Sequence, residues 1–408
     1  MKNTKCKYDV CVIGGAGHVG APLSIVMAKK GLKVLIYDLN EATIAQLKRG
    51  KMPFFEEGAE PLLKQALLDG RLGFTTKVAD IAQIPYLIVT IGTPVDQYQN
   101  PMLNVVVECI DSLFPFLSDD QTLVLRSTVF PGVTDYVHKY LEGRGKHPKV
   151  AFCPERVVQG FAVKEVQALP QMVSGATPEA EEAAAELFAK ICSKVVRLTT
   201  MEAEFAKLFC NAYRYIQFAT ANQFYMMAKN AGVDYYRVLE TIKHNYPRMR
   251  DMPGAGFAAG PCLLKDTMQL AAFANHEFSL GSAAVLVNEG LPLHMVDHLS
   301  SQYDLSKMTV GLLGMAFKAD SDDPRSSLSY KLKKVLRFRA RQVLTTDPFV
   351  KTDPELLPLG DVVKKSDLLI LCTPHQTYRT LDVKGKPVVD IWNFVEAGVA
   401  DGEAARVR

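Results

Sequence analysis

The sequence predicts an α/β protein with two Rossmann-like domains, each built on a parallel sheet, joined by a long central helix and a helical domain. Short β-rich runs alternate with helical stretches as far as residue 200, and this alternation resumes beyond residue 306. Between them, residues 201–232 contain no proline and no glycine before Gly232, which is typical of one long helix with a glycine stop. We therefore expect three domains, at residues 1–200, 201–303 and 304–408.

Individual elements follow from the same alternation. In the first domain we expect strands at residues 8–13, 34–38, 86–90, 122–126, 149–152 and 195–198, and a helix at 179–191. In the last domain we expect strands at residues 309–313, 342–346, 368–371 and 387–391. A segment rich in Gly, Pro and Ala at residues 252–261 interrupts the helical middle of the chain.

Composition excludes several classes of function. The 47 basic and 44 acidic residues nearly cancel, which argues against nucleic acid or an anionic membrane as a partner. The 8 cysteines are scattered singly without Cys-x-x-Cys pairs, so we expect reduced thiols, no metal site and a cytoplasmic protein. No apolar run has membrane-spanning length, and no signal peptide is apparent before the first strand.

A glycine-rich turn follows the first expected strand. Gly15, Gly17 and Gly20 have the G-x-G-x-x-G spacing, which lets a pyrophosphate approach the N-terminus of the next helix. Asp38 ends the second expected strand, where a carboxylate can bind both ribose hydroxyls and repel the extra phosphate of NADP. The pattern favours NAD as the cofactor, although FAD uses the same fingerprint.

Two further groups of polar residues could carry chemistry. Cys262 is expected at a loop-to-helix junction with Lys265 and Asp266 close behind it, a setting that can activate a thiol, although most single cysteines only fill space. On the long helix, Lys207, Asn211 and Arg214 share one face. Taken by themselves, these three side chains are expected to face solvent.

All these motifs occur in one order along the chain, and together they resemble the UDP-glucose/GDP-mannose dehydrogenase family over nearly its whole length. The motifs that carry the resemblance, besides the glycine-rich turn, are Gly92-Thr93-Pro94, Arg126-Ser127-Thr128-Val129 with Pro131-Gly132, Cys153-Pro154-Glu155-Arg156, Lys207-Leu208-x-x-Asn211-Ala212, Gly260-Pro261-Cys262-x-x-Lys265-Asp266, Gly314-Met315-Ala316-Phe317-Lys318 and Asp322-Asp323-x-Arg325-Ser326.

The resemblance implies a four-electron oxidation of the C6 hydroxymethyl group of a UDP-hexose by NAD. Cys262 would capture the intermediate aldehyde as a thiohemiacetal, which is oxidised to a thioester and hydrolysed to the uronic acid. Lys207 and Asn211 would stabilise the oxyanion, and Thr128 would help to hold the water. Asp266 and Glu155 are the expected proton-transfer groups.

The resemblance also implies the binding residues. For the cofactor these are Gly15, Gly17, His18, Val19, Gly20, Asp38, Thr93, Thr128 and Lys265. For the UDP-sugar they are Glu155, Arg156, Val157, Lys207, Asn211, Arg214, Arg248, Gly260, Phe317, Lys318 and Arg325. Fixed cations such as Lys318 and Arg325 suit a diphosphate, and a guanidinium can bind it bidentately.

The identity of the sugar depends on a few positions. Arg156 after Pro-Glu, and Tyr246-Pro247-Arg248, resemble the branch of the family that acts on UDP-N-acetylhexosamines, so UDP-N-acetylmannosamine or UDP-N-acetylglucosamine is expected. UDP-glucose is the first alternative, then a two-electron oxidation of the hydroxyacid type, then a catalytically silent nucleotide-sugar-binding protein. Leu264 and Leu328 stand where the family often has proline, and Gly14 adds a glycine to the first loop. The family also dimerises through its helical domain, so a homodimer is expected.

Overall fold

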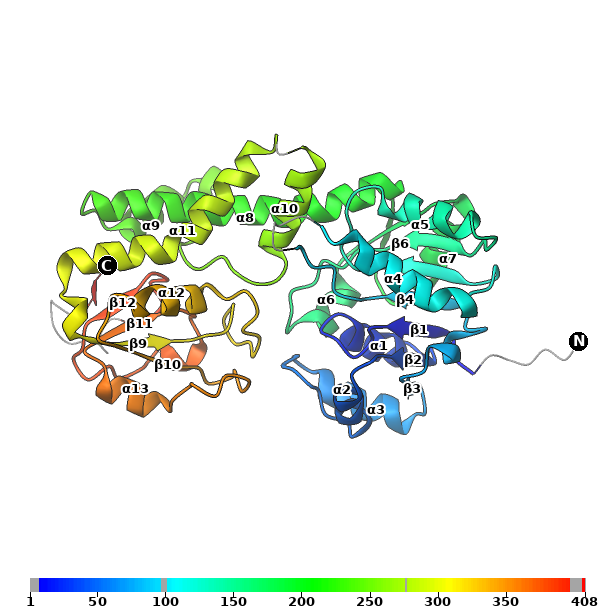
Figure 1. The fold of residues 1–408 in the computed structure, drawn as a ribbon, viewed down its shortest axis with the longest axis horizontal. Coiled ribbons are helices and arrows are strands. Elements are labelled where there is room, and N and C mark those ends of the chain that lie inside the picture. Colours follow the sequence, from blue (N-terminus) through cyan, green and yellow to red (C-terminus); the bar gives the residue numbers. More distant parts are fainter. Residues whose placement is uncertain (1–6, 97–100, 276, 397–405, 408) are drawn as a thin grey trace, which may run out of the picture. The chain divides into compact units, whose positions relative to one another are not determined.

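The computed structural model describes residues 7–96, 101–275, 277–396 and 406–407, and it divides into two compact units, residues 1–210 and 211–408 (Figure 1). The division falls inside the long helix α8, which spans Thr200–Asn230. The helical middle and the C-terminal sheet belong to one unit because Tyr225, Leu239, Val310 and Leu332 share a single hydrophobic cluster. The expected domain boundaries near residues 200 and 303 stay a prediction.

Unit 1 contains an eight-stranded sheet with the order β3-β2-β1-β4-β5-β6-β7-β8. Its strands are β1 (Val10–Ile13), β2 (Val34–Tyr37), β3 (Leu72–Thr75), β4 (Tyr86–Val89), β5 (Thr122–Leu125), β6 (Lys149–Phe152), β7 (Gln171–Gly175) and β8 (Val195–Arg197). All neighbours are parallel except β6 and β7, which are antiparallel, so the sheet is parallel as expected apart from this one pair.

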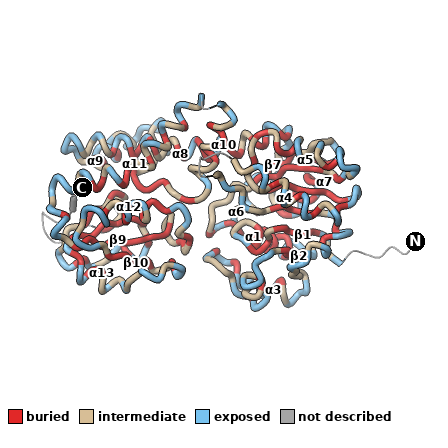
Figure 2. Tube along the Cα trace, in the orientation of Figure 1, coloured by how far each residue is buried: buried red, intermediate tan, exposed pale blue. Residues whose placement is uncertain are grey.

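Helices cover both faces of this sheet, because its central strands are apolar on both sides. Val10 and Val12 face one cluster and Cys11 and Ile13 the other, as the two-residue period of a strand requires. Figure 2 shows the strands buried and the outer helical surfaces exposed. The helices of unit 1 are α1 (Gly20–Lys29), α2 (Glu41–Lys48), α3 (Ala59–Leu68), α4 (Leu103–Leu113), α5 (Val133–Glu142), α6 (Ala162–Ala168) and α7 (Pro178–Ala189).

Unit 2 combines the helical middle of the chain with a second sheet of order β10-β9-β11-β12-β13. Its strands are β9 (Thr309–Leu313), β10 (Gln342–Thr346), β11 (Leu368–Leu371), β12 (Val388–Asp390) and β13 (Arg406–Val407), all in parallel pairs. Its helices, after α8, are α9 (Tyr235–Lys243), α10 (Leu263–Phe273), α11 (Ser279–Gln302), α12 (Leu328–Arg337) and α13 (Leu359–Lys365).

Helix α8 ends as the glycine stop predicts. Gly232 adopts a φ of 69°, and the N–H of Val233 donates to the carbonyl of Ala228 at 2.8 Å, which satisfies one of the last helical carbonyls. Farther back, the fully buried Asn222 bonds both the N–H (2.8 Å) and the C=O (2.9 Å) of Gly256. This amide therefore fixes the non-helical segment that leads to Cys262 against α8.

Candidate active site

The glycine-rich turn of unit 1 leaves one glycine unexplained by protein packing. A side chain at Gly15 would place its Cβ 2.6 Å from the carbonyl oxygen of Val12, and one at Gly20 would meet the Cα of Gly15 at 2.5 Å. A Cβ at Gly17, in contrast, would meet nothing closer than 3.4 Å. Because the fold itself tolerates a methyl group at Gly17, a ligand that approaches the backbone there explains the residue.

Asp38 lies beside this turn at the end of β2. One carboxylate oxygen accepts the N–H of Ala16 at 3.0 Å and the other accepts the N–H of Asn40 at 2.9 Å. The side chain is half-buried, so its remaining lone pairs are accessible. With the N-terminus of α1, which begins after Val19, the turn and Asp38 fit the pyrophosphate and ribose of NAD.

The strand order of unit 1 reverses between β1 and β4, and in α/β sheets ligands bind at such a switch point. Polar residues follow the neighbouring strands there. Thr90 donates to the carbonyl of Ile13 at 2.9 Å, and Thr93 donates to the carbonyl of Thr128 at 2.6 Å. These bonds bring Thr93 and Thr128, both expected cofactor residues, to the same edge as the glycine-rich turn.

His18 connects the glycine-rich turn to the loop after β6. Its ring lies 4.0 Å from the ring of Phe54, centroid to centroid, and its Nδ1 is 3.0 Å from Nε2 of Gln159. The sequence analysis missed Gln159 and Phe54, because neither belongs to a motif and both lie far from His18 in the chain.

Both carboxylate oxygens of Glu155 are bound by protein groups. One carboxylate oxygen is paired with the buried Arg126, and the other accepts the N–H groups of Arg156 (2.7 Å) and Val157 (2.9 Å). Arg126 also donates to Gln171 at 3.0 Å. Gln171 carried no signal in the sequence, whereas Arg126 stood in a motif without an assigned role. With both oxygens occupied, the geometry favours a positioning role for Glu155 over proton transfer.

Unit 2 places an exposed thiol at a helix N-terminus. Cys262 is the N-cap residue of α10, and it is exposed to solvent. One turn into the helix, the fully buried Asp266 accepts a 2.6 Å hydrogen bond from Asn211 of α8 and pairs with Lys265 at 2.9 Å. Thus four of the expected catalytic and cofactor residues, Cys262, Asp266, Asn211 and Lys265, meet where α8 packs against α10.

Lys207 and Asn211 do not face solvent, so the expectation drawn from the polar stripe is wrong for both. Lys207 is 9% exposed and Asn211 6% exposed, whereas Arg214 is exposed as expected. Across the part of the chain that the structure describes, the Lys207 ammonium has no hydrogen-bond or ion-pair partner. A nearly buried cation without a counter-charge is costly, and this indicates a place for an anionic or polarised ligand group.

The loop after β9 supports the segment before Cys262. Gly260 has a φ of 101°, and a Cβ there would lie 2.6 Å from the ring of Phe317, so only glycine fits. The N–H of Gly260 also donates to the carbonyl of Ser326 at 3.3 Å. Phe317 and Gly260, two expected substrate residues, are therefore in contact.

Arg325 lies close to Cys262 but is already engaged by Asp323. Its Nε and Nη2 donate to the Asp323 carboxylate at 2.9 and 2.7 Å. The hydrogen bonds to Asp323, and then the charge of that carboxylate, raise the pKa of the Arg325 guanidinium against the opposing effect of burial, and Cys262 would add to this rise as a thiolate. Bidentate binding of a diphosphate by the same edge of the guanidinium, as expected from the sequence, would require Asp323 to move.

Two other expected substrate residues lie in unit 2. Lys318 is half-buried in the same loop as Arg325, and Arg248 is exposed beside Tyr246.

The other thiols differ from Cys262. Burial raises the pKa of Cys11 and of Cys153 to about 12 and that of Cys109 to about 11. Cys6 lies outside the described residues. Within the described ranges there is no group of three or more His, Cys, Asp or Glu residues placed to hold a metal, and no helix there is long and apolar enough to cross a bilayer.

Comparisons with known proteins show which family the chain belongs to. Three domain descriptions of the UDP-glucose/GDP-mannose dehydrogenase family match the chain: the NAD binding domain at residues 8–192, the central domain at 201–290 and the UDP binding domain at 311–397. The chain is 28% identical over 401 residues to a UDP-N-acetyl-D-mannosamine dehydrogenase of Pyrococcus horikoshii, an alignment that covers 94% of this chain and 95% of the relative.

Solved structures are similar over almost the whole chain. A UDP-D-ManNAc dehydrogenase from Pyrococcus horikoshii superposes with a TM-score of 0.89 at 25% identity, covering 98% of this chain and 99% of the other. A UDP-glucose dehydrogenase from Pyrobaculum islandicum gives 0.88 at 25% identity with the same coverage. The UDP-N-acetyl-mannosamine dehydrogenase from Staphylococcus aureus gives 0.85 at 26% identity, with 95% of each chain covered.

We predict that Gly17→Ala weakens NAD binding without unfolding the protein, because its Cβ has room in the fold but not beneath a pyrophosphate. The dissociation constant, measured by calorimetry, should rise about tenfold or more. Gly15→Ala is the contrasting variant, since its Cβ would collide with Val12, and it should lower the melting temperature. Unchanged NAD affinity in Gly17→Ala would contradict the assignment of this turn.

We also predict that iodoacetamide labels Cys262 first. Its exposure, Arg325 and the N-terminus of α10 all favour a reactive thiolate, whereas a thiol with a pKa of about 12, such as Cys153, is ionised in roughly one molecule in ten thousand near pH 8. Peptide mass spectrometry gives the rate at each thiol. Cys210, exposed on α8, is the matched control. Labelling of Cys210 ahead of Cys262 would count against an activated Cys262.

Proposed function

Because the chain belongs to the UDP-glucose/GDP-mannose dehydrogenase family, we propose that it oxidises the C6 hydroxymethyl group of a UDP-N-acetylhexosamine to the carboxylate, with Cys262 as the covalent nucleophile. The protein is an NAD-dependent nucleotide-sugar dehydrogenase, as its relatives are. The observation that carries the finer proposal is the exposed Cys262 thiol at the N-terminus of α10, above the buried pair of Asn211 and Asp266.

The proposed reaction removes four electrons and adds one oxygen atom. NAD, when bound, accepts a hydride from C6 in each of two oxidations. After the first, the sulfur of Cys262 bonds to the C6 aldehyde and gives a thiohemiacetal; after the second, the same carbon is a thioester. Water then attacks the thioester carbon, the C–S bond breaks, and the uronic acid leaves with the Cys262 thiolate regenerated.

Lys207 and Asn211 stand one turn apart on α8, so both can reach a single oxygen. The Lys207 ammonium is nearly buried and has no partner in the described structure. Such a preorganised cation can stabilise the negative charge that develops on the C6 oxygen during the reaction. Asn211 is oriented by its hydrogen bond to Asp266. Asp266, whose donors are movable side chains, remains our proposed proton-transfer group.

The loop after β6 is proposed to read the sugar. Arg126 holds Glu155, and Glu155 in turn fixes the backbone of Arg156 and Val157. Arg156 stands where UDP-N-acetylhexosamine enzymes carry arginine, and two of the similar proteins named above act on UDP-N-acetylmannosamine. A UDP-glucose dehydrogenase is similar too, so UDP-glucose is the second candidate.

UDP itself is proposed to bind the loop after β9, within the segment that matches the UDP binding domain. Phe317 and Lys318 would contact the nucleotide diphosphate, joined by Arg325 after it shifts from Asp323, and by the exposed Arg248 and Arg214. Lys265 and Thr128 are proposed to contact the cofactor, and Thr128 also the hydrolytic water.

We predict that Cys262→Ser abolishes formation of the uronic acid while NAD binding stays within about twofold, because the serine hydroxyl is a far weaker nucleophile. Wild-type protein, followed at the NADH absorbance with UDP-ManNAc, UDP-GlcNAc, UDP-glucose and GDP-mannose, should give its highest kcat/KM with a UDP-N-acetylhexosamine and release two NADH per sugar.

Other outcomes of this experiment identify the rival functions. One NADH per substrate would indicate a two-electron dehydrogenase, and no NADH with any sugar would indicate a silent binding protein. Undiminished acid formation by Cys262→Ser would reject the covalent role. Cys210→Ser, which removes the other exposed thiol of the described chain, is the matched control and should keep wild-type turnover.

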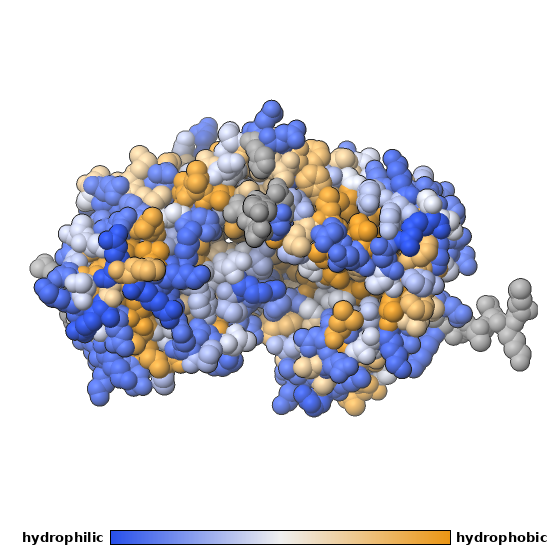
Figure 3. Space-filling view, viewed as in Figure 1, coloured by the Kyte–Doolittle hydropathy of each residue, from blue (hydrophilic) through white to orange (hydrophobic). Residues whose placement is uncertain are grey.

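We further propose that two copies of the chain associate through α8. Phe209, Tyr213, Phe224 and Met227 are 44 to 64% exposed, and at 100° per residue they form one apolar stripe along the helix. Figure 3 shows hydrophobic patches between hydrophilic ones on the face in view. Such a stripe on a two-fold axis is self-complementary.

We predict a mass of twice the 45.0 kDa chain by light scattering, and dissociation on Met227→Glu, because a carboxylate within an apolar interface must be desolvated. Leu68→Glu, at a leucine that is 82% exposed on α3, is the control and should leave the mass unchanged. A monomeric wild type would contradict the proposed dimer.

A further inference from the structure

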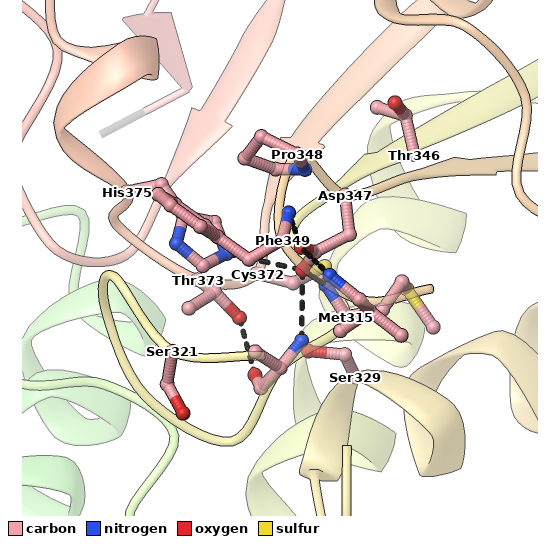
Figure 4. A network of polar contacts seen from close by, with 12 residues as sticks. Met315, Ser321, Ser329, Thr346, Asp347, Pro348, Phe349, Cys372, Thr373 and His375 are labelled. Atoms are coloured by element: carbon pink, nitrogen blue, oxygen red, sulfur yellow. Dashed lines mark hydrogen bonds and ion pairs between the residues drawn. The ribbon is translucent and has the colours of Figure 1, made fainter. Parts of the chain in front are cut away.

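Asp347 is a fully buried carboxylate that has no role in the proposed mechanism. It follows β10, its side chain is fully buried, and Figure 4 shows it beside the ring of His375 and the backbone of Met315. Its donors are the N–H groups of Met315 (2.7 Å), Ala316 (2.9 Å), Phe349 (2.8 Å) and Val350 (2.9 Å), and Nε2 of His375 (3.0 Å). Burial would raise the pKa of Asp347, but these hydrogen bonds, that of His375 first, outweigh it and lower the pKa to about 2.

His375 joins this carboxylate to the middle of the loop after β9. Its ring is fully buried, and its Nδ1 accepts the backbone N–H of Asp320 at 2.9 Å. Since Nδ1 accepts, the ring proton is on Nε2 and points at Asp347. The rings of Phe349 and Tyr378, with centroids 5.0 and 5.5 Å away, hold the imidazole in this orientation.

Loop 314–327 is thereby tied at its start and at its middle. Asp347 holds the N–H groups of Met315 and Ala316, while His375 holds Asp320, which adopts a φ of 49°. Thr373 adds a 2.7 Å hydrogen bond to the carbonyl of Ala316. The left-handed conformation of Asp320 is uncommon for residues with a side chain, although aspartate tolerates it better than most, and the hydrogen bond from its N–H to His375 helps to hold it.

The same loop supports the proposed active site from its other side. Phe317 packs on Gly260, Ser326 accepts the N–H of Gly260, and Arg325 lies close enough to Cys262 for their charges to interact. Lys318 belongs to this loop as well. A shift of residues 315–320 would therefore reach both the thiol segment and the cation proposed to bind diphosphate.

Asp347 occupies the place that Asp38 has in unit 1, after the second strand of a Rossmann-like sheet. Asp38 is half-buried and accepts only two backbone N–H groups in the described structure, which leaves room for a ribose. Asp347 is enclosed and receives five donors, so it cannot serve a ligand in the same way. In unit 2, the carboxylate equivalent to Asp38 therefore holds protein backbone instead of a ligand.

We propose that His375 is a positioning residue, which locks Asp347 and Asp320 together so that loop 314–327 supports the Gly260–Cys262 segment and holds Lys318 in place for a nucleotide diphosphate. The inference rests on the proposed function only in that UDP is the ligand of this loop.

Calorimetric titration with UDP and, separately, with NAD tests the proposal. His375→Ala removes both links and should raise the dissociation constant for UDP about tenfold or more, as expected for the loss of a buried hydrogen bond to a charged group. The constant for NAD should stay within about twofold, since the glycine-rich turn and Asp38 belong to unit 1. With a nucleotide-sugar substrate, KM should rise more than kcat falls.

Two conservative variants separate the links. In His375→Asn, the oxygen of the new amide can take the position of Nδ1 and keep the bond to Asp320, whereas the longer amide of His375→Gln can reach the position of Nε2 and keep the bond to Asp347. Each should recover part of the UDP affinity. If His375→Ala does not fold, as judged by circular dichroism, the same comparison with wild type is made with these two variants, which should each bind UDP more weakly than wild type.

Tyr378→Phe is the matched control, because it keeps the ring beside His375 and removes only a hydroxyl, which interacts with the backbone of Thr346 and Gly314 and, among the contacts described, with none of residues 315–320. It should bind UDP as wild type does. Wild-type affinity in the folded His375 variants, or an equal loss in Tyr378→Phe, would overturn the positioning role. Failure of the wild-type protein to bind UDP would instead overturn the proposed function.

Discussion

One hydrogen bond, from Nδ2 of Asn211 to Oδ2 of Asp266 at 2.6 Å, joins the long helix α8 to the helix that begins at Cys262. Asp266 is fully buried, and a buried carboxylate is tolerated only when charged or polar partners compensate its desolvation. Asn211 and Lys265 provide that compensation, so the relative register of α8 and α10 is fixed. The same register sets which turn of α8 lies near the thiol, and Lys207 is on the adjacent turn.

Unit 1 brings backbone and side chains from distant segments of the chain to one edge of its sheet. Parallel strands deliver their carboxyl ends to that edge, and the reversal of strand order between β1 and β4 separates the loops there. The buried Arg126 then fixes the loop after β6 through Glu155. Removing one partner of such a pair would leave the other charge uncompensated, which explains why a positioning role suits both residues.

The sequence predicted the parts of this molecule that depend on local pattern. Strands β9, β10 and β11 were predicted to the residue because each is a short run rich in apolar or β-branched residues, and the glycine-rich turn and Cys262 were found from their motifs. Strand β3 was missed because Gly73 weakens its pattern and most of its residues are only half-buried. The burial of Lys207 was not predictable, since helical periodicity says which residues share a face but not what covers that face. The partners Gln171, Gln159 and His375 were missed because each lies far along the chain from the residue that it holds.

The two sheets show how one architecture can be adapted to two ligands. In unit 1 the turn after β1 leads directly into α1, so the helix N-terminus stands at the strand end, where a pyrophosphate can meet free backbone dipoles. In unit 2, residues 314–327 separate β9 from α12, and the helix N-terminus is removed from that position. A loop of this length does not offer a fixed helix dipole, so in the proposed function a diphosphate is bound by side-chain cations, and these are useful only when the loop that carries them is held still. Asp347 meets that requirement: the carboxylate at the position that Asp38 has in unit 1 is committed in unit 2 to backbone N–H groups at the start of the loop and, through His375, to Asp320.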